Sequence, residues 1–355
     1  MRKQKIRVLF LNYADIDNYN AQNLNAREIA LRLDPESFEV TLLVAGQPDS
    51  RLAEKSHIRL LFLPKRLGSV SMLWDSLLRQ DILFSPSLAL NFTGLYFRIP
   101  GLVRQRVRTI FWIEGEIKGN LEGASKRILE HFELLKRDVD TWIAITDYVA
   151  KTSLEHYGID SQRVIPVGVN SSIFTPHMRN TSKPVKILFV GHFIQRKGVD
   201  LILELANVLR EVEFHLVGKS RDGYESKLQM IAGNYQLTNV FFHEPMPQPR
   251  LARLMHESDL LVHPSKVEGM PKVVLEAAAT GLPAIIFDEY QAPVIVDGTT
   301  GYQVKTFDEM LLRTRQLTEN AELRLEMGQA AVDYVSRYSW DVLVRQWEQV
   351  LHAQV

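Results

Sequence analysis

The chain has 355 residues, and at about 150 residues per domain this length favours two domains, each large enough for its own core. Hydrophobic residues make up 46% and charged residues 24%, which is ordinary for a soluble globular enzyme. Lys plus Arg and Asp plus Glu both number 42, so no field of one sign recruits nucleic acid, and we expect no nucleic-acid partner.

Cysteine usage and the length of apolar runs bear on the compartment. The chain has no cysteine, which excludes disulfides and thiolate metal sites and fits a reducing compartment, so we expect a cytoplasmic protein. The basic N-terminus carries an apolar run too short for a signal peptide. No stretch approaches the roughly 18 apolar residues of a membrane span.

Short apolar strands alternate with longer amphipathic helices in the first half of the chain. The expected strands are residues 8–11, 40–44, 58–63, 109–113 and 141–145, and the expected helices are 22–33, 125–137 and 148–157. Alternation of this kind builds parallel sheets that are covered by helices on both faces. Ligands of such sheets bind beyond the carboxyl ends of the strands.

A basic and aromatic segment interrupts this alternation at residues 91–110. It contains Arg98, Arg104, Arg106 and Arg108 among aromatic and aliphatic residues, and no acid. In a chain of balanced charge, such a segment can mark an acidic or lipid-linked acceptor, or peripheral contact with a membrane. The alternative is an amphipathic core helix with a solvated face.

The second half repeats the alternation after a polar stretch at residues 170–184, which predicts a linker. The expected strands are residues 186–190, 213–217, 240–242, 260–263 and 284–287, and the expected helices are 199–210, 223–232, 248–256, 272–279 and 307–317. The chain therefore reads as two doubly wound α/β halves.

Two glutamates, Glu268 and Glu276, flank the start of the helix expected at residues 272–279. Pro271 is expected in the first turn of that helix, where its missing N–H costs nothing. Free backbone N–H groups at a helix start favour an anion such as a diphosphate, whereas carboxylates accept hydrogen bonds from hydroxyls. The pattern predicts a ligand with both phosphates and hydroxyls, a nucleotide sugar; the alternative is an ordinary pair of helix-surface glutamates.

This stretch, residues 264–283, resembles the retaining glycosyltransferases of family 4, whose fingerprint is two glutamates separated by seven residues. Similar family markers are the segments ILFVGHFIQRKGVD, RVIPVGVNSSIFTP, TTGYQV and YSWDVLVRQW, whereas residues 1–140 match only in outline. The resemblance implies the GT-B fold, an α/β architecture with two Rossmann-like doubly wound domains facing each other across a cleft. The implied domains are an acceptor-side domain at residues 1–168, a linker at 169–184, a donor-binding domain at 185–336 and a final helix at 337–355 that crosses back to the first domain.

The resemblance also assigns residues to the departing diphosphate. Lys197 matches the lysine that neutralises the leaving group, a role that needs a fixed positive charge as the phosphate departs. The family usually has an arginine after the glycine at Gly191, and here His192 follows instead, so either Arg196 or a protonated His192 takes that place. The alternative for these cations is solvated charge before a helix.

Further donor contacts follow from the same resemblance. Glu276 holds the ribose diol and Glu268 contacts the transferred sugar. The turn after residues 240–242 borders the nucleobase, and His243 beside it can also be a strand-end core histidine. The remaining donor-binding candidates lie in loops after strands: Gly191, Gly218 and Lys219 towards the phosphates, Glu244, Pro245 and Met246 towards the base, and Gly269, Met270, Pro271, Lys272 and Val273 towards the sugar and phosphates.

On the acceptor side the matches are fewer. Asn20, Gln22 and Asn23 stand in the place of the family's Gly-Gly loop and offer side-chain amides. Glu114 or Glu116 stands where many relatives have a histidine beside the sugar; the alternative is a pair of loop carboxylates in water.

We therefore expect a retaining enzyme that moves a sugar from a UDP-, GDP- or ADP-linked donor to a hydroxyl of a glycan, lipid-linked or small-molecule acceptor. We expect no metal and no cofactor besides the nucleotide sugar as co-substrate. Two alternatives remain, a GT-B-fold nucleotide-sugar epimerase and a non-catalytic scaffold of the same fold. A scaffold predicts a decayed donor site, whereas Lys197, Glu268 and Glu276 are all present.

Overall fold

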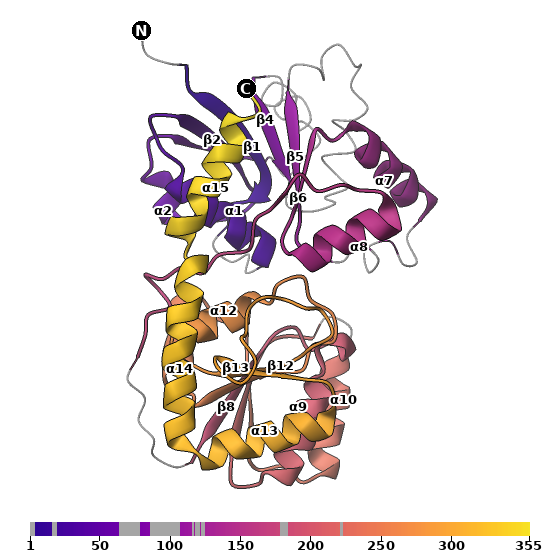
Figure 1. Ribbon diagram of the computed structural model, residues 1–355, viewed down its shortest axis with the longest axis vertical. Coiled ribbons are helices and arrows are strands. Elements are labelled where there is room, and N and C mark those ends of the chain that lie inside the picture. The colour runs from indigo at the N-terminus through magenta and orange to yellow at the C-terminus, as the bar shows by residue number, and fades with distance from the viewer. Residues whose placement is uncertain are drawn as a thin grey trace. The chain divides into compact units, whose positions relative to one another are not determined.

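A computed structural model describes residues 4–15, 20–63, 79–85, 107–115, 117, 121, 125–177, 184–220 and 223–355. The chain divides into two compact units (Figure 1). The first unit comprises residues 1–167 together with 340–355, and the second comprises residues 168–339.

The first unit is built on a seven-stranded parallel sheet in the order β3-β2-β1-β4-β5-β6-β7. The strands are β1 Ile6–Tyr13, β2 Phe38–Val44, β3 Ile58–Phe62, β4 Ile82–Ser85, β5 Arg108–Ile113, β6 Thr141–Ala144 and β7 Arg163–Val164. The helices given for this unit are α1 Ala21–Arg32, α2 Ser50–Ala53, α7 Lys126–Asp138, α8 Asp147–Tyr157 and α15 Trp340–His352. The central strands are nearly fully buried, as strands covered on both faces must be.

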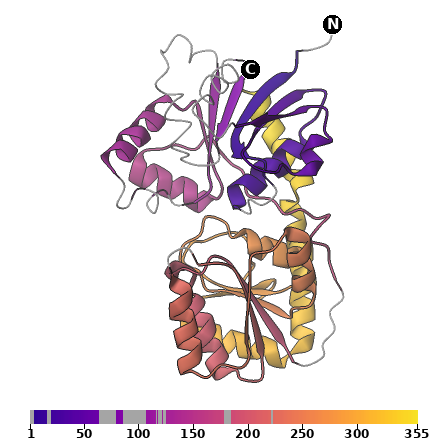
Figure 2. The same cartoon turned by 180° about the vertical axis from the view of Figure 1, so that it is seen from behind.

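The last helix, α15, packs beside α1 in this first unit (Figures 1 and 2). Its Trp347 is fully buried and lies edge-on against Phe84, 5.1 Å between ring centroids, and Trp112, 4.9 Å. Arg32 at the end of α1 forms an ion pair with Asp341 at the start of α15, 2.6 Å. The helix thus completes the core of the sheet that the chain began with.

The second unit is built on a six-stranded parallel sheet in the order β10-β9-β8-β11-β12-β13. The strands are β8 Lys186–Val190, β9 Glu213–Val217, β10 Val240–His243, β11 Leu260–His263, β12 Ala284–Phe287 and β13 Gly301–Val304. The helices are α9 Val199–Val208, α10 Tyr224–Asn234, α11 Gln248–His256, α12 Lys272–Ala279, α13 Phe307–Glu319 and α14 Ala321–Val335, with short 3₁₀ turns at Gln195–Lys197 and Ser336–Tyr338.

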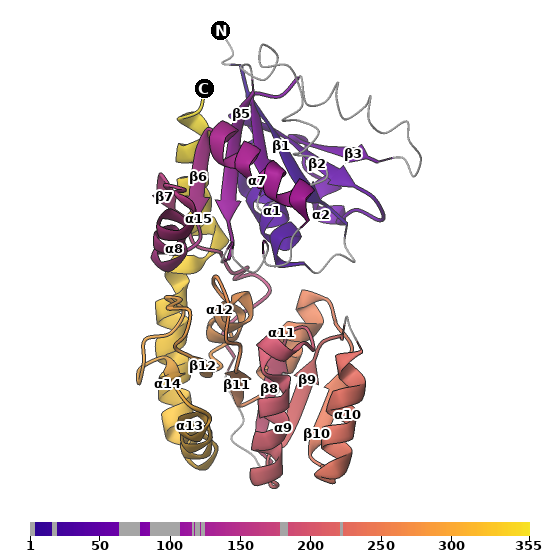
Figure 3. The same cartoon turned by 90° about the vertical axis from the view of Figure 1, so that its right-hand side faces the viewer.

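The strand order of the second sheet reverses between β8 and β11. From β8 the chain proceeds to β9 and β10 on one side, and then returns to β11, β12 and β13 on the other. Helices α9 and α10 therefore lie on one face, and α12 and α14 on the opposite face (Figures 1 and 3). The loops after β8 and β11 flank the crevice that doubly wound sheets use for ligands.

Some elements differ from those expected. The sequence did not indicate β4, a strand of only four residues, or the two-residue strand β7. It also missed α14, whose apolar stripe is broken by Gly328. A Cβ at Gly328 would collide with the carbonyl of Gly281, so this glycine lets α14 approach the end of α12 closely.

Candidate active site

The loops that follow β8 and β11 dock onto each other at the reversal of strand order. Gly198 has a left-handed φ of +65°, and a Cβ there would collide with the carbonyl of Pro264. The Lys266 N–H donates a hydrogen bond to the carbonyl of Arg196, 3.1 Å. Glycine is therefore required for this approach, which brings the turn before α9 against the loop before α12.

This docking places Lys197 beside Glu268. The Lys197 ammonium donates a hydrogen bond to Oε1 of the Glu268 carboxylate. Nε2 of His263 lies 3.1 Å from the same oxygen. Burial by itself raises the pKa of Glu268, but the hydrogen bond from His263 and the charge of Lys197 outweigh it and hold that pKa well below its usual range. The carboxylate is therefore ionised and already paired.

Lys197 and Glu268 were each predicted from the sequence as site residues, and the structure brings them together. His263 was missed. It is the last residue of β11 and stands directly before the Pro-Ser turn, at the carboxyl end of a strand where ligand sites form. That position was a usable signal.

The two residues proposed to replace the family arginine lie in the same turn. Both side chains are exposed. The guanidinium of Arg196 donates a hydrogen bond to the carbonyl of Val267, 2.9 Å, and so braces the loop that carries Glu268. Which of Arg196 and His192 faces the diphosphate stays a prediction.

Gly218, directly after β9, lies in close contact with neighbouring protein groups. A Cβ at Gly218 would collide with the carbonyl of Gly191 and approach the ring of Phe193. The Gly218 N–H donates to the carbonyl of His243, 3.0 Å. Gly218 thus accommodates neighbouring protein backbone, and its expected approach to a ligand stays a prediction. Lys219 beside it is exposed.

The start of α12 has no side-chain cap. Pro271 occupies the position before the first helical residue, with φ −70° and ψ 104°, and not the first turn as expected. No side chain caps this end and the first turn contains no acid, so no carboxylate of that turn offsets the positive end of the helix dipole. Gly269, Met270, Pro271 and Lys272 are buried, and Val273 is half-buried.

Glu276 lies in the second turn of α12 and is 5% exposed. Burial raises the pKa of this carboxyl to about 7, against the opposing charge of Lys272 and a hydrogen bond from Gln248. The Gln248 amide donates to Oε1 of Glu276 at 3.1 Å. Gln248 was not predicted as a site residue; it begins α11, close after the turn expected at the nucleobase.

That turn follows β10. Glu244 and Pro245 are exposed and Met246 is half-buried. His243 packs against His215 of β9, with the rings stacked at 5.2 Å and nitrogens Nε2 and Nδ1 3.0 Å apart. This contact supports the alternative for His243, a strand-end core histidine.

In the first unit, the predicted amide side chains bind neighbouring protein groups. Asn20 caps α1 by accepting a hydrogen bond from the N–H of Gln22, 2.9 Å, and Asn23 accepts from the side chain of Asn12 and the N–H of Tyr13, both 3.1 Å. These amides hold the β1–α1 connection together, so their predicted contact with a ligand stays untested.

Glu114 is half-buried after β5 and accepts a hydrogen bond from Asn25, 3.0 Å. The carboxylate of Asp15 accepts hydrogen bonds from the N–H groups of Ala45 and Gly46. Glu116 lies outside the described residues, as does most of the basic segment expected at residues 91–110.

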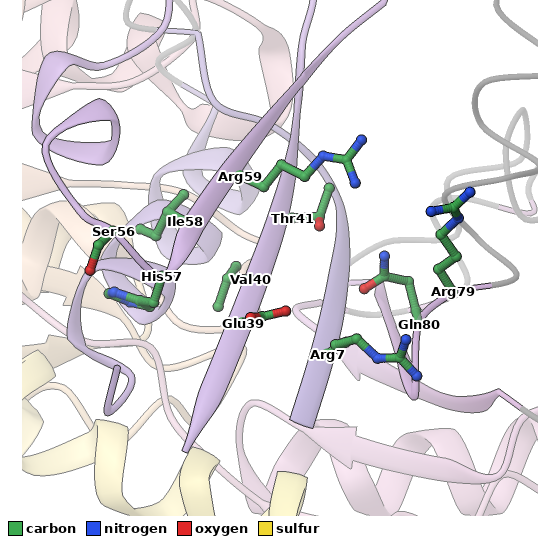
Figure 4. Close-up of a pocket in the computed structure, with 10 residues that line it drawn as sticks. All are labelled: Arg7, Glu39, Val40, Thr41, Ser56, His57, Ile58, Arg59, Arg79 and Gln80. Carbon is green, nitrogen blue, oxygen red and sulfur yellow. The ribbon is translucent and has the colours of Figure 1, made fainter. Parts of the chain in front are cut away.

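A cavity of about 370 Å³ lies in the first unit and is distinct from these residues (Figure 4). It is lined by side chains at the amino ends of β1, β2 and β3, among them Arg7, Glu39 and Arg59. Arg7 is engaged by Asp81 at 2.7 Å. The cavity therefore lies at the edge opposite the carboxyl ends of the strands, and we assign it no catalytic role.

Within the described ranges, no group of three or more His, Asp or Glu side chains is arranged to hold a metal ion. Among the helices that the structure describes, none is long and apolar enough to cross a membrane.

Comparison with known proteins adds to this geometry. Residues 175–333 match the model of the family described as glycosyl transferases group 1. Over 218 residues the chain is 28% identical to a D-inositol 3-phosphate glycosyltransferase of Paenarthrobacter aurescens, a match that covers 56% of this chain and 53% of that protein. The chain thus spans about half the length of this curated relative.

Two solved structures are similar over nearly the whole chain. Sucrose-phosphate synthase from Thermosynechococcus elongatus has a TM-score of 0.80 at 17% identity and covers 99% of both chains. Anabaena HepE in complex with UDP and glucose has a TM-score of 0.80 at 15% identity and covers 98% of this chain and 100% of that one. At these identities the likeness is one of fold.

Proposed function

Because residues 175–333 belong to the glycosyl transferases group 1 and the chain has the GT-B fold, we propose that it is a retaining glycosyltransferase. It moves a sugar from a nucleotide diphosphate sugar to a hydroxyl of a glycan, lipid-linked or small-molecule acceptor. The observation that carries this proposal is the pairing of Lys197 with Glu268 beside the uncapped start of α12.

The second unit supplies a partner for each part of such a donor. The N–H groups at the start of α12 and the Lys197 ammonium receive the diphosphate. Glu276 accepts hydrogen bonds from the ribose diol, and Glu268 accepts them from the transferred sugar. UDP-linked glucose is the first donor to test, because the similar Anabaena protein has been seen with UDP and glucose.

The retaining course requires charge stabilisation more than a base. The bond between the anomeric carbon and the phosphate oxygen breaks, and the acceptor oxygen forms its bond on the same face of the sugar. The acceptor proton passes to the departing phosphate oxygen. Lys197 and the positive end of α12 stabilise the charge that develops on that phosphate.

The partners of three described acids favour this course over inversion, which needs a general base on the opposite face. Glu268 is paired with Lys197 and His263, and Glu276 is bound by Gln248. In the first unit the carboxylate of Asp15 is bound by two backbone N–H groups.

The first experiment is a thermal-shift panel of UDP, GDP and ADP and their sugars, since a selective ligand stabilises the folded protein by mass action. Donor turnover is then followed by proton NMR with α-linked donor and a panel of hydroxyl acceptors. We expect an α-linked product. A β-linked product contradicts retention and reopens the search for a base.

The same spectra separate the two alternatives. An epimerase converts the nucleotide sugar to its epimer without an acceptor, and a scaffold leaves the donor unchanged. A cytoplasmic location, membrane contact through residues 91–110 and independence from metal stay predictions.

A further inference from the structure

One oxygen of the Glu268 carboxylate has two partners. Oε1 accepts from the Lys197 ammonium, on the loop after β8, and from Nε2 of His263, at the end of β11. The side chain of His263 is 1% exposed, whereas those of Lys197 and Glu268 are 12% and 13% exposed. The two donors to Oε1 therefore differ in how easily they can move.

The His263 ring is fixed as a neutral donor. A carboxylate oxygen only accepts, so Nε2 carries the hydrogen and Nδ1 keeps its lone pair. Nδ1 is buried and has no hydrogen-bond partner among the residues that the structure describes. A second proton would place an N–H there without an acceptor, and burial accordingly lowers the pKa of His263. The ring also stacks on Phe189, 6.1 Å between centroids and 17° between planes.

Lys197, in contrast, has a long side chain and a second task. In the proposed function its charge neutralises the donor diphosphate, so the ammonium that pairs with Glu268 is drawn towards the phosphates when donor binds. A buried carboxylate that loses its only partner is costly. His263 remains on Oε1 and prevents that outcome.

We propose that His263 is a positioning residue that keeps Glu268 ionised and in place while Lys197 turns to the diphosphate. The inference rests on the proposed function and deepens it. His263 does not touch the donor in this scheme, and it acts through Glu268 by making the Lys197 ammonium easier to release.

The test measures UDP affinity by calorimetry in matched variants. His263→Phe removes the donor nitrogen but keeps a flat ring on Phe189, and we expect UDP affinity to fall about tenfold, because Glu268 then retains Lys197 more firmly. His263→Gln, whose amide can donate from a similar position, should restore most of that affinity. Phe189→Leu alters the stacking and the local core packing but keeps both donors to Oε1, so it should leave UDP affinity within about twofold of the unsubstituted protein.

The deciding measurement repeats His263→Phe in a Glu268→Gln background. In this background no Glu268 carboxylate competes with the diphosphate for Lys197. Adding His263→Phe to it should therefore change UDP affinity by less than about twofold. An equal loss in both backgrounds would show that His263 serves packing only and overturns the inference, as would no loss in either. Circular dichroism of each variant checks that it is folded.

A second measurement uses the unsubstituted protein. Nitrogen-15 NMR of the histidine rings should show His263 protonated at Nε2 and not at Nδ1, both before and after saturation with UDP. A doubly protonated ring, or the other tautomer, overturns the inference. If the unsubstituted protein binds none of UDP, GDP and ADP, the proposed function is wrong, and so is this inference, which rests on it. If it binds UDP and His263→Phe binds equally well, the role of His263 alone is wrong.

Discussion

Glu276 is the residue whose protonation state should set nucleotide affinity. Burial raises its pKa to about 7, and only the ionised carboxylate can accept hydrogen bonds at both oxygens from a ribose diol. We expect affinity for UDP-glucose to rise from pH 6 to pH 8, by up to about tenfold per pH unit below the pKa. Calorimetry checks this, because the diphosphate of UDP-glucose is esterified at both ends and does not titrate in this range.

Glu276→Gln is the matched variant for that experiment, since it keeps the size of the side chain and removes the titration. Its affinity for UDP-glucose should be lower and nearly flat with pH. A wild-type profile that is flat, or a variant that keeps the slope, contradicts the ribose assignment.

The raised pKa of Glu276 also predicts how the free energy of unfolding depends on pH. The pKa of Glu276 is raised from 4.5 to about 7 in the folded protein, so the folded state holds a proton that the unfolded state has released. The stability from this group is fully present below about pH 4.5 and is lost as pH rises through about 7. In denaturant titrations without ligand, Glu276→Gln should therefore show a shallower fall in stability between pH 5 and pH 8. An unchanged slope would show that Glu276 is not the titrating group.

Lys197→Ala should lower kcat more than it raises KM for the donor. The ammonium already has a partner in Glu268, so its net benefit comes mainly as charge builds on the departing phosphate. We expect kcat to fall by about a hundredfold or more, the usual effect of removing a group that stabilises developing charge. Steady-state kinetics of Lys266→Ala, an exposed lysine of the adjoining loop, is the control. A raised KM with unchanged kcat would limit Lys197 to binding.

At the scale of elements, the docking of two loops depends on one glycine. Gly198 has φ +65° and Gly223 has φ +70°, but a Cβ at Gly198 would collide with the carbonyl of Pro264, whereas nothing lies within 4 Å of one at Gly223. Gly223→Ala should cost about 1 kcal/mol, from the left-handed backbone alone. Gly198→Ala adds the collision and should cost clearly more in denaturant unfolding, and it should also lower kcat by displacing Lys197. Equal costs for the two variants would contradict the close approach.

The elements also show what could be predicted from sequence. Strands β8, β9, β11 and β12 were predicted with the bounds they have, because each is a short, mostly apolar run that is followed by turn residues. The sequence pattern missed β4 and α14. Gly328 of α14 serves a contact with the end of α12 that periodicity does not reveal.

The site was predicted as separate residues and not as pairs. Lys197 and Glu268 were predicted from local motifs. They come into contact because β8 and β11 are neighbours in the sheet, and local periodicity does not predict strand order. Gln248 and Glu276 likewise belong to different helices. Partners far apart in the chain are therefore the part that local sequence reasoning could not supply.

At the scale of the whole molecule, each unit has its own core, and α15 contributes to the first. Trp347→Ala should destabilise the first unit by about 3–5 kcal/mol, the usual cost of emptying a buried aromatic site. UDP affinity should stay within about twofold, because the proposed nucleotide contacts lie in the second unit. Unfolding is followed by tryptophan fluorescence. Val342→Ala, on the same helix and 49% exposed, is the control and should cost less than about 0.5 kcal/mol. A comparable loss in both variants would contradict the packing described for α15.

The chain order of the two units has a consequence for biosynthesis. The second unit, residues 168–339, is continuous, whereas the first is completed by residues 340–355. Domains usually fold in the order in which the ribosome makes them. In the first unit, Trp347 of α15 covers Phe84 and Trp112. We expect these two side chains to stay uncovered until α15 has left the ribosomal exit tunnel. We therefore expect the first unit to finish folding after residues 168–339 have been made, and its exposed core in the meantime is the kind of surface that chaperones bind.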